Sequence, residues 1–272
     1  MSRLLKADVY RVLKSRLSLI ALILALAFPV LIVLLYAGIQ WIGGLGEEMG
    51  GMLFNANSLI GSAYSLSNNI GLVVPAFAGI LVCSDYTNGT LRNKVIAGNR
   101  RSHIYLSHLI VSILFSVVVI TIYAAVTAGL ALLFFPFNWD SALDLGREIL
   151  YFVVNGTMSF AFIATVSTLL ALTLRNVAPT IIFTIVFSIV LLALSSIVML
   201  VNYEPYKYAV YCIPTFAGNF FTLNSTGIFG LLGETADASR DVIFIEGMLS
   251  YLFFGAVHTV IGLLLFKKRD IR

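Results

Sequence analysis

The sequence offers few side chains that could catalyse a reaction or hold a metal ion. Its three histidines are His103, His108 and His258, and the first two are five residues apart. On a helix that spacing separates two side chains by about 140°, so they would not converge on one metal. The two cysteines are too few for a disulfide framework or a four-ligand site. Glu47 and Glu48 are adjacent but lie among glycines. We therefore expect the histidines to make polar contacts between helices, and we expect no bound metal and no catalysis by this chain.

The composition indicates a membrane protein. The chain has 272 residues, of which 60% are hydrophobic and 11% charged, with a mean hydropathy of +0.98. Soluble proteins carry about 25% charged residues. This excludes a nucleic-acid-binding domain despite the net charge of +4, and it argues against a water-soluble enzyme. There is no Gly-x-x-x-x-Gly-Lys-Ser/Thr loop to hold ATP phosphates. The length predicts a single domain over residues 1–272.

Six apolar stretches predict an all-α polytopic fold. A helix needs about 20 apolar residues to cross a bilayer, and helices satisfy their own backbone polar groups there. Apart from histidine, the spans contain no ionisable side chain of the kind that marks a proton or ion pathway, which weakens the case for an ion-coupled transporter. The spans are expected near residues 18–40, 66–84, 106–134, 149–173, 179–201 and 248–266.

The basic residues predict the orientation. Fourteen of the seventeen lie in the N-terminal segment, in the loop after the second span, at Arg175 and in the C-terminal tail. Basic residues near span ends stay in the cytoplasm. Both termini are therefore expected inside. The first apolar run is about twice as long as the 7–15 residues of a signal peptide, which predicts a retained anchor.

Two further segments combine apolar residues with basic or helix-breaking ones. Residues 3–17 predict an amphipathic helix in the membrane interface, the alternative being a merely basic tail. Residues 209–233 are apolar but interrupted by Pro214 and Gly218, which predicts a re-entrant hairpin within an outer loop at 202–246. The apolar face of the first segment is expected to carry Leu5, Val9, Val12 and Leu13, with Arg3, Lys6 and Lys14 opposite.

The loop after the second span predicts a short helix at residues 87–98. Thr87 or Asn88 can cap its start, and Gly98 can end it in the left-handed conformation. Leu91 and Val95 are one turn apart. Because so short a helix is marginal in water, it needs a partner surface. That surface is either another protein or the anionic headgroups of the bilayer, and the spacing alone does not choose between them.

The chain resembles the permease subunit of type-2 ABC exporters. The resemblance lies in the topology and in the pattern Asp-x-x-x-Gly-Thr-Leu-Arg-Asn, residues 85–93. The stretch 89–110 is similar to the subgroup associated with bacitracin resistance and lantibiotic immunity. In that family the loop forms a coupling helix that docks on a separate ATPase subunit, and the first segment forms an elbow helix. The resemblance assigns the coupling segment Asp85, Gly89, Thr90, Leu91, Arg92, Val95 and Arg101, with Leu91 and Val95 as contact points.

The resemblance also implies a function. Two permease chains, identical or different, would pair in the bacterial plasma membrane and export an amphipathic molecule such as a peptide antibiotic. Each would bind a cytoplasmic ATPase subunit that holds ATP and Mg²⁺, while this chain would bind no cofactor. Membrane lipid is expected as a partner and nucleic acid is not. Two alternatives stay open, a carrier or channel without an ATPase and a membrane anchor that transmits force. Candidates to line the pathway are Tyr64, Asn68, Asn69 and Asn155.

Overall fold

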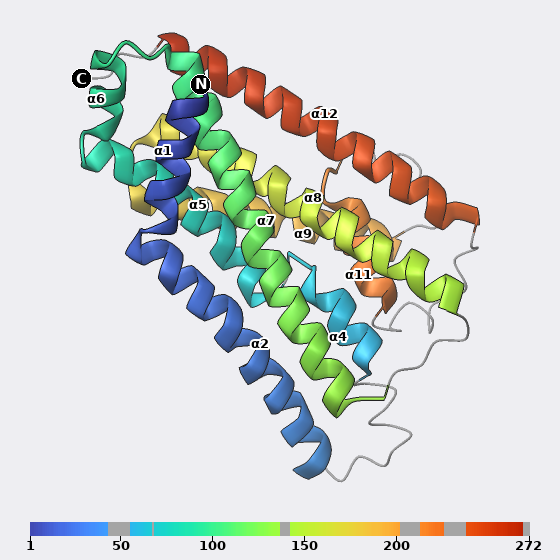
Figure 1. Cartoon of the computed structure of the whole chain (residues 1–272). Helices are drawn as coiled ribbons and strands as arrows, with labels where there is room; N and C mark the ends of the chain where they lie inside the picture. The colour runs from blue at the N-terminus through green and yellow to red at the C-terminus, as the bar shows by residue number, and fades with distance from the viewer. Residues whose placement is uncertain (43–54, 67, 137–141, 202–212, 226–237, 269–272) are drawn as a thin grey trace.

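Long helices make up most of the molecule. The computed structural model describes residues 1–42, 55–66, 68–136, 142–201, 213–225 and 238–268, and every regular element among these is helical. Five helices are long and apolar enough to cross a membrane (Figure 1). They are α2 (Arg16–Ile42), α7 (Arg101–Phe134), α8 (Ala142–Leu174), α9 (Val177–Val201) and α12 (Ala238–Lys268). The all-helical class is therefore confirmed over the described residues.

The second predicted span, 66–84, corresponds to α5 (Asn69–Thr87), and the short helix α4 (Ala56–Ala63) precedes it. α4 begins at Asn55, whose Oδ1 accepts a hydrogen bond of 2.7 Å from the Ser58 backbone N–H. α5 follows after an interruption and has 19 residues. At 1.5 Å per residue α5 reaches about 28 Å, slightly less than the roughly 30 Å of hydrocarbon. α5 is not among the five long candidate spans, and six continuous spans are not shown.

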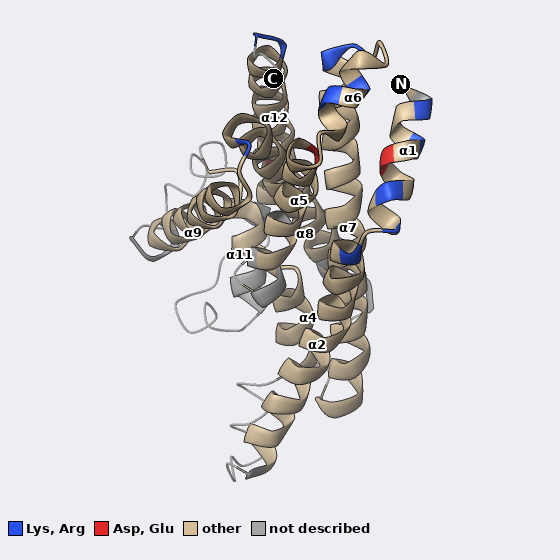
Figure 2. Ribbon diagram, turned by 90° about the vertical axis from the view of Figure 1, so that its left-hand side faces the viewer, with Lys and Arg blue, Asp and Glu red and all other residues tan. Residues whose placement is uncertain are grey.

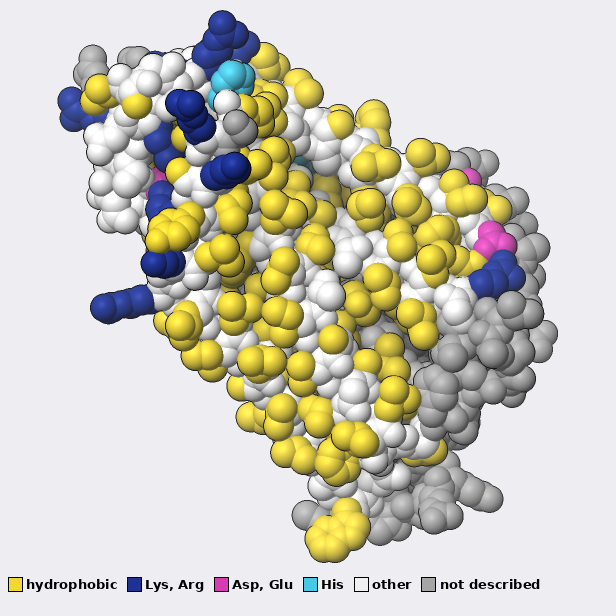
Figure 3. Space-filling model, in the orientation of Figure 1, with side chains coloured by type: hydrophobic (Ala, Val, Ile, Leu, Met, Phe, Trp, Pro, Cys, Tyr) yellow, Lys and Arg dark blue, Asp and Glu magenta, His cyan; other side chains and the backbone are white. Residues whose placement is uncertain are grey.

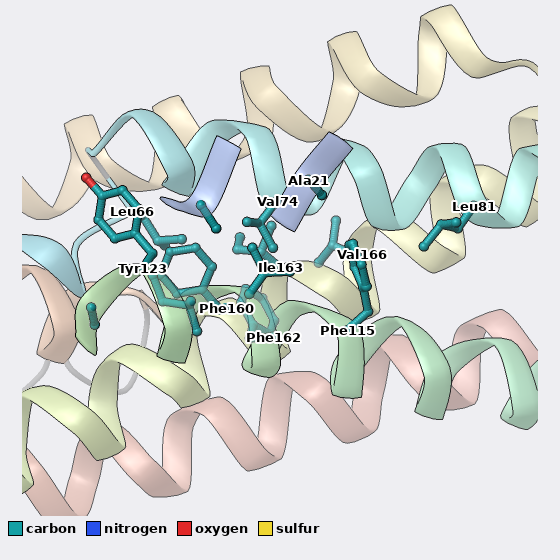
Figure 4. Close-up of a cluster of buried hydrophobic side chains, with 14 of the residues drawn as sticks. Ala21, Leu66, Val74, Leu81, Phe115, Tyr123, Phe160, Phe162, Ile163 and Val166 are labelled. Atoms are coloured by element: carbon teal, nitrogen blue, oxygen red, sulfur yellow. The ribbon is translucent and has the colours of Figure 1, made fainter. Parts of the chain in front are cut away.

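α5 lies at the centre of the bundle. It packs against α7, α8 and α9, while α2 packs along α7 (Figure 1). Buried aromatic and aliphatic side chains from these helices form the main core. The residues labelled in Figure 4 are Ala21, Leu66, Val74, Leu81, Phe115, Tyr123, Phe160, Phe162, Ile163 and Val166. Hydrophobic side chains also cover much of the outer surface, as expected of helices that face lipid (Figure 3).

Part of the predicted outer hairpin is described. Pro214 precedes α11 (Phe216–Ser225), a short helix that packs against α4, α8 and α9. Phe216 and Phe221 of α11 are buried in a small cluster with Tyr151 of α8. Residues 202–212 and 226–237 lie outside the described part, so the re-entrant path over 209–233 stays a prediction.

Lysine and arginine gather at one end of the bundle, here called the basic end. This end carries α1 (Ser2–Leu13), α6 (Thr90–Ile96) and the last turn of α12 (Figure 2). α1 packs along the first turns of α7. Leu5, Val9 and Val12 pack against the bundle, whereas Leu13 is 73% exposed. That these four residues form the apolar face of an interfacial helix stays a prediction.

Candidate functional site

Two left-handed glycines define α6. α5 continues through Thr87, and the Asn88 N–H donates to the Ser84 carbonyl at 3.0 Å. The predicted cap at Thr87 or Asn88 is therefore wrong. The chain reverses at Gly89, whose φ of 67° is a conformation that suits a residue without Cβ. The predicted end at Gly98 is confirmed by a φ of 80°. Gly98 N–H donates to Val95 O at 3.0 Å and Asn99 N–H to Lys94 O at 3.3 Å, which satisfies the last carbonyls.

Leu91 anchors α6 to the bundle. Its side chain is only 1% exposed, and Val95 lies partly buried beside it. Leu91 therefore faces the bundle and not the exposed surface of α6, where the resemblance would place a contact with the ATPase. The exposed side of α6 carries Arg92, Asn93 and Ile96, and Ile96 is 74% exposed. The cluster around Leu91 consists of Val82, Cys83, Ile104, Tyr105, Ala171, Leu172 and Phe266.

Beneath α6 lies a buried charge cluster formed by Asp8, Arg11, Asp85, Lys94 and His108. Lys94 Nζ donates to Asp8 Oδ1 at 2.7 Å and to Asp85 Oδ2 at 2.9 Å. His108 Nε2 lies 3.1 Å from Asp85 Oδ2 and 3.3 Å from Lys94 Nζ. Arg11 forms an ion pair with Asp85. The charge cluster therefore joins α1, α5, α6 and α7.

Neighbouring hydroxyls complete the charge cluster. Thr90 Oγ1 donates to Asp85 Oδ1 at 2.6 Å, and Ser107 Oγ donates to Asp8 Oδ2 at 2.7 Å. Both carboxylates are almost fully buried. Buried charges persist only when they are paired and hydrogen-bonded. Here two carboxylates face two cations, and the formal charges balance when the histidine is neutral.

The surroundings shift the protonation of these groups. Burial by itself would raise the pKa of Asp8, but the hydrogen bonds from Lys94 and Ser107 outweigh it and hold that pKa below its usual value. Burial lowers the pKa of Lys94, against the opposing effect of the Asp8 carboxylate. Burial also lowers the pKa of Arg11. The charge cluster thus favours an ionised Asp8.

Residue spacing within one segment does not predict the charge cluster. Asp8 lies three residues after Leu5 and four before Val12, on the same face of the helix. An acid on the apolar face of a basic amphipathic helix is the signal that could have found it. His108 makes the polar helix contact that was expected of it. Arg101 donates to the Lys267 carbonyl at 3.1 Å and so joins α7 to α12.

The candidate pathway residues lie near the interruption between α4 and α5. Tyr64 packs so closely on α8 that a Cβ added at Gly156 would lie 2.6 Å from the Tyr64 Cβ. Asn68 Nδ2 donates to the Ser62 carbonyl at 3.3 Å. Asn155 is fully buried, and its Nδ2 donates to the Tyr151 carbonyl at 3.1 Å. The structure thus places Tyr64 beside the α8 turn that carries Asn155. Asn69 begins α5, and its side chain lies outside the described part.

A groove runs beside Tyr64. It has a volume of about 410 Å³ and lies between α4, α7 and α8. Ile60 and Tyr64 line it from the α4 side, Thr121, Ala125 and Ala128 from α7, and Phe152 from α8. Small side chains on α7, such as Ala125 and Ala128, leave this space open. Such a groove suits a largely apolar ligand.

The fold and the basic end together define a multi-pass membrane protein. Residues 4–191 match the family model for ABC-2 family transporter proteins, which covers most of the chain, so the chain belongs to the ABC-2 transporter family. It is thus the membrane subunit of an ABC transporter, and a separate partner subunit hydrolyses ATP. The match includes all members of the charge cluster. It does not confirm the bacitracin and lantibiotic subgroup. A comparison with curated proteins found no match.

Proposed function

We propose that this permease subunit exports an amphipathic molecule and that its ATPase partner docks on α6. The observation that carries the proposal is the charge cluster, which fixes α6 to α1, α5 and α7 while one side of α6 stays exposed. α6 has seven residues and would be marginal alone in water. Held by Leu91 and Lys94, it can move with the bundle as one rigid part.

The exposed side of α6 is the proposed docking surface. Ile96 supplies an apolar contact, and Arg92 and Asn93 supply polar ones. A docked ATPase that changes shape on binding ATP would push on α6. Because the charge cluster joins α6 to α5 and α7, that push would reach both helices. The docked ATPase can shift the permease between two conformations only if it makes different contacts with each of them.

The proposed assembly contains two permease chains and two ATPase subunits in a bacterial plasma membrane. ATP and Mg²⁺ belong to the ATPase, and this chain binds neither. The basic end faces the cytoplasm, in accord with the positions of α1, α6 and the end of α12. Both termini would then be inside.

The groove beside Tyr64 is the proposed site for the apolar part of the cargo. Its volume of about 410 Å³ falls within the usual range for ligand sites. Interrupted helices at membrane depth often form binding sites in transporters, and Tyr64 and Asn68 lie where α4 gives way to α5. Asn69 and Asn155 complete the proposed polar part of the pathway. A peptide antibiotic would satisfy these requirements.

We expect Ile96→Asp to abolish docking of the ATPase. A charge replacing an exposed apolar contact is desolvated without a partner when the surfaces meet, which costs about 1–3 kcal/mol or more. The amount of ATPase that co-purifies with the permease should fall about fivefold or more. Leu13→Asp is the matched control, because Leu13 is 73% exposed and Ile96 is 74% exposed. Normal co-purification of the Ile96→Asp permease would show that α6 is not the docking helix.

We expect Ala128→Phe to weaken cargo binding. A phenyl ring would occupy the groove, and such overpacking costs about 1–3 kcal/mol, or about fivefold or more in affinity. The measurement is the binding of dansyl-labelled bacitracin, an amphipathic peptide, followed by fluorescence in detergent. Val118→Phe on the exposed side of α7 is the control. Equal affinity of the two variants would remove the groove from the pathway.

A further inference from the structure

A second cavity lies at the basic end, where α1 is followed by α2. Its volume is about 310 Å³. It is bounded by α1, by the start of α2 and by the turn between α5 and α6. Its apolar part is formed by Val12, Leu17 and Leu81, and its polar part includes Arg11, Arg16 and Asn88. The proposed docking of the ATPase and the proposed cargo site do not use this cavity.

Arg16 contributes an uncompensated positive charge to the cavity. Within the part of the chain that the structure describes, its guanidinium has no hydrogen bond or ion pair. Arg11, in contrast, is held by Asp85 and by Thr90 Oγ1 at 3.5 Å. Arg16 is the first residue of the apolar helix α2, and Leu17 begins its apolar run. Arg16 therefore lies where lipid headgroups meet hydrocarbon.

The combination of features in the cavity matches a phospholipid. A guanidinium presents a planar set of donors that fits two oxygens of a phosphate group. Basic pockets beside membrane helices bind acidic headgroups. The floor formed by Val12, Leu17 and Leu81 offers nothing to a free phosphate but can contact the first part of an acyl chain. A choline or ethanolamine headgroup gains little here, because Asp8 and Asp85 are buried and already paired.

We propose that this cavity binds one monoanionic phospholipid from the leaflet at the basic end. Its phosphate accepts hydrogen bonds from Arg16 and Asn88, and its acyl chain lies on Leu17 and Leu81. The lipid is adjacent to Arg11, which pairs with Asp85 in the charge cluster. The site thus places a lipid between α2, the first membrane helix, and the turn that leads from α5 into α6. The proposal holds whichever cargo the transporter moves.

The test is lipid retention by the full-length chain. The protein is reconstituted in vesicles of equal parts phosphatidylglycerol and phosphatidylcholine, extracted in detergent and examined by native mass spectrometry. The expected result is one retained phosphatidylglycerol per chain and about fivefold less in Arg16→Gln, because one basic residue near the surface is worth about that factor. Lys14→Gln removes the same charge two residues away. Lys14 lies over the Tyr10 ring and does not line the cavity, so this variant should retain the lipid.

Further variants and ligands make the outcome decisive. Asn88→Trp fills the edge of the cavity without changing charge and should also release the lipid, whereas retention by this variant would overturn the proposal. Equal loss in Lys14→Gln and Arg16→Gln would indicate general charge attraction and overturn it. Retention of phosphatidylcholine equal to that of phosphatidylglycerol would also overturn the proposal. Displacement of the lipid by excess inorganic phosphate would overturn it too and would identify free phosphate as the ligand. Thermal unfolding of each variant confirms that it is folded.

Discussion

Replacing Lys94 with methionine should release α6 from the bundle at a cost of about 3–5 kcal/mol, the usual effect of removing one partner from a buried ion pair. Lys94 Nζ is the donor shared by Asp8 at 2.7 Å and Asp85 at 2.9 Å. Without it, Asp8 keeps the Ser107 hydroxyl and an arginine nitrogen at 3.9 Å. A buried carboxylate is then left short of positive charge. Amide hydrogen exchange over residues 88–99 should accelerate by about 100-fold or more.

Three variants test the cause of that acceleration. Arg92→Met removes a charge from the exposed side of the same helix and should change stability by no more than about 0.5 kcal/mol. Lys94→Arg should restore part of the protection, because it keeps the positive charge. The double variant Asp8→Asn, Lys94→Met should also regain part of the protection from hydrogen exchange, because it no longer contains an uncompensated carboxylate. Unchanged exchange in Lys94→Met would mean that the charge cluster does not hold α6.

Leu91→Ala should destabilise the basic end by about 2–5 kcal/mol, the range for truncating a buried leucine. The side chain is 1% exposed and belongs to a buried cluster with residues of α5, α7, α8 and α12. Neighbouring side chains cannot fill the space without moving these helices. The unfolding midpoint of the purified permease should fall, and ATPase co-purification should fall with it.

Ile96→Ala is the control for Leu91→Ala. Ile96 is on the same helix but 74% exposed, so its truncation should leave the midpoint unchanged. Together the two variants separate anchoring from docking. Leu91 would act through the position of α6, and Ile96 through direct contact with the ATPase. An unchanged midpoint in Leu91→Ala would show that hydrophobic burial contributes little to holding α6.

The buried side of α6 shows what its apolar spacing left open. Leu91 and Val95 are one turn apart, which predicts one apolar face, and its partner could have been another protein or the headgroups of the bilayer. In the structure the face meets the bundle. The polar Lys94 also faces inward, where the carboxylates of Asp8 and Asp85 accept its hydrogen bonds. Periodicity identifies a face but not its partner.

Local properties of the chain were sufficient for the all-helical, multi-pass fold class, whereas the six spans and their orientation stay predictions. Long uncharged runs require helices in lipid, and basic residues gather beside the ends of these runs. Gly98 could be recognised as a helix end, because a left-handed turn favours glycine wherever it occurs. The start of α6 was missed because Gly89 makes the same conformation one residue beyond the expected caps.

Tertiary packing alone decided the candidate site. Lys94 and Asp8 are separated by 86 residues along the chain, and each looks like an ordinary surface charge in its own segment. They meet only because α1 and α6 pack on the same part of α7 and because burial makes an unpaired charge too costly. The contact of Tyr64 with Gly156 and the two cavities have the same origin. They depend on the rotation and spacing of whole helices, which hydropathy along one chain does not specify.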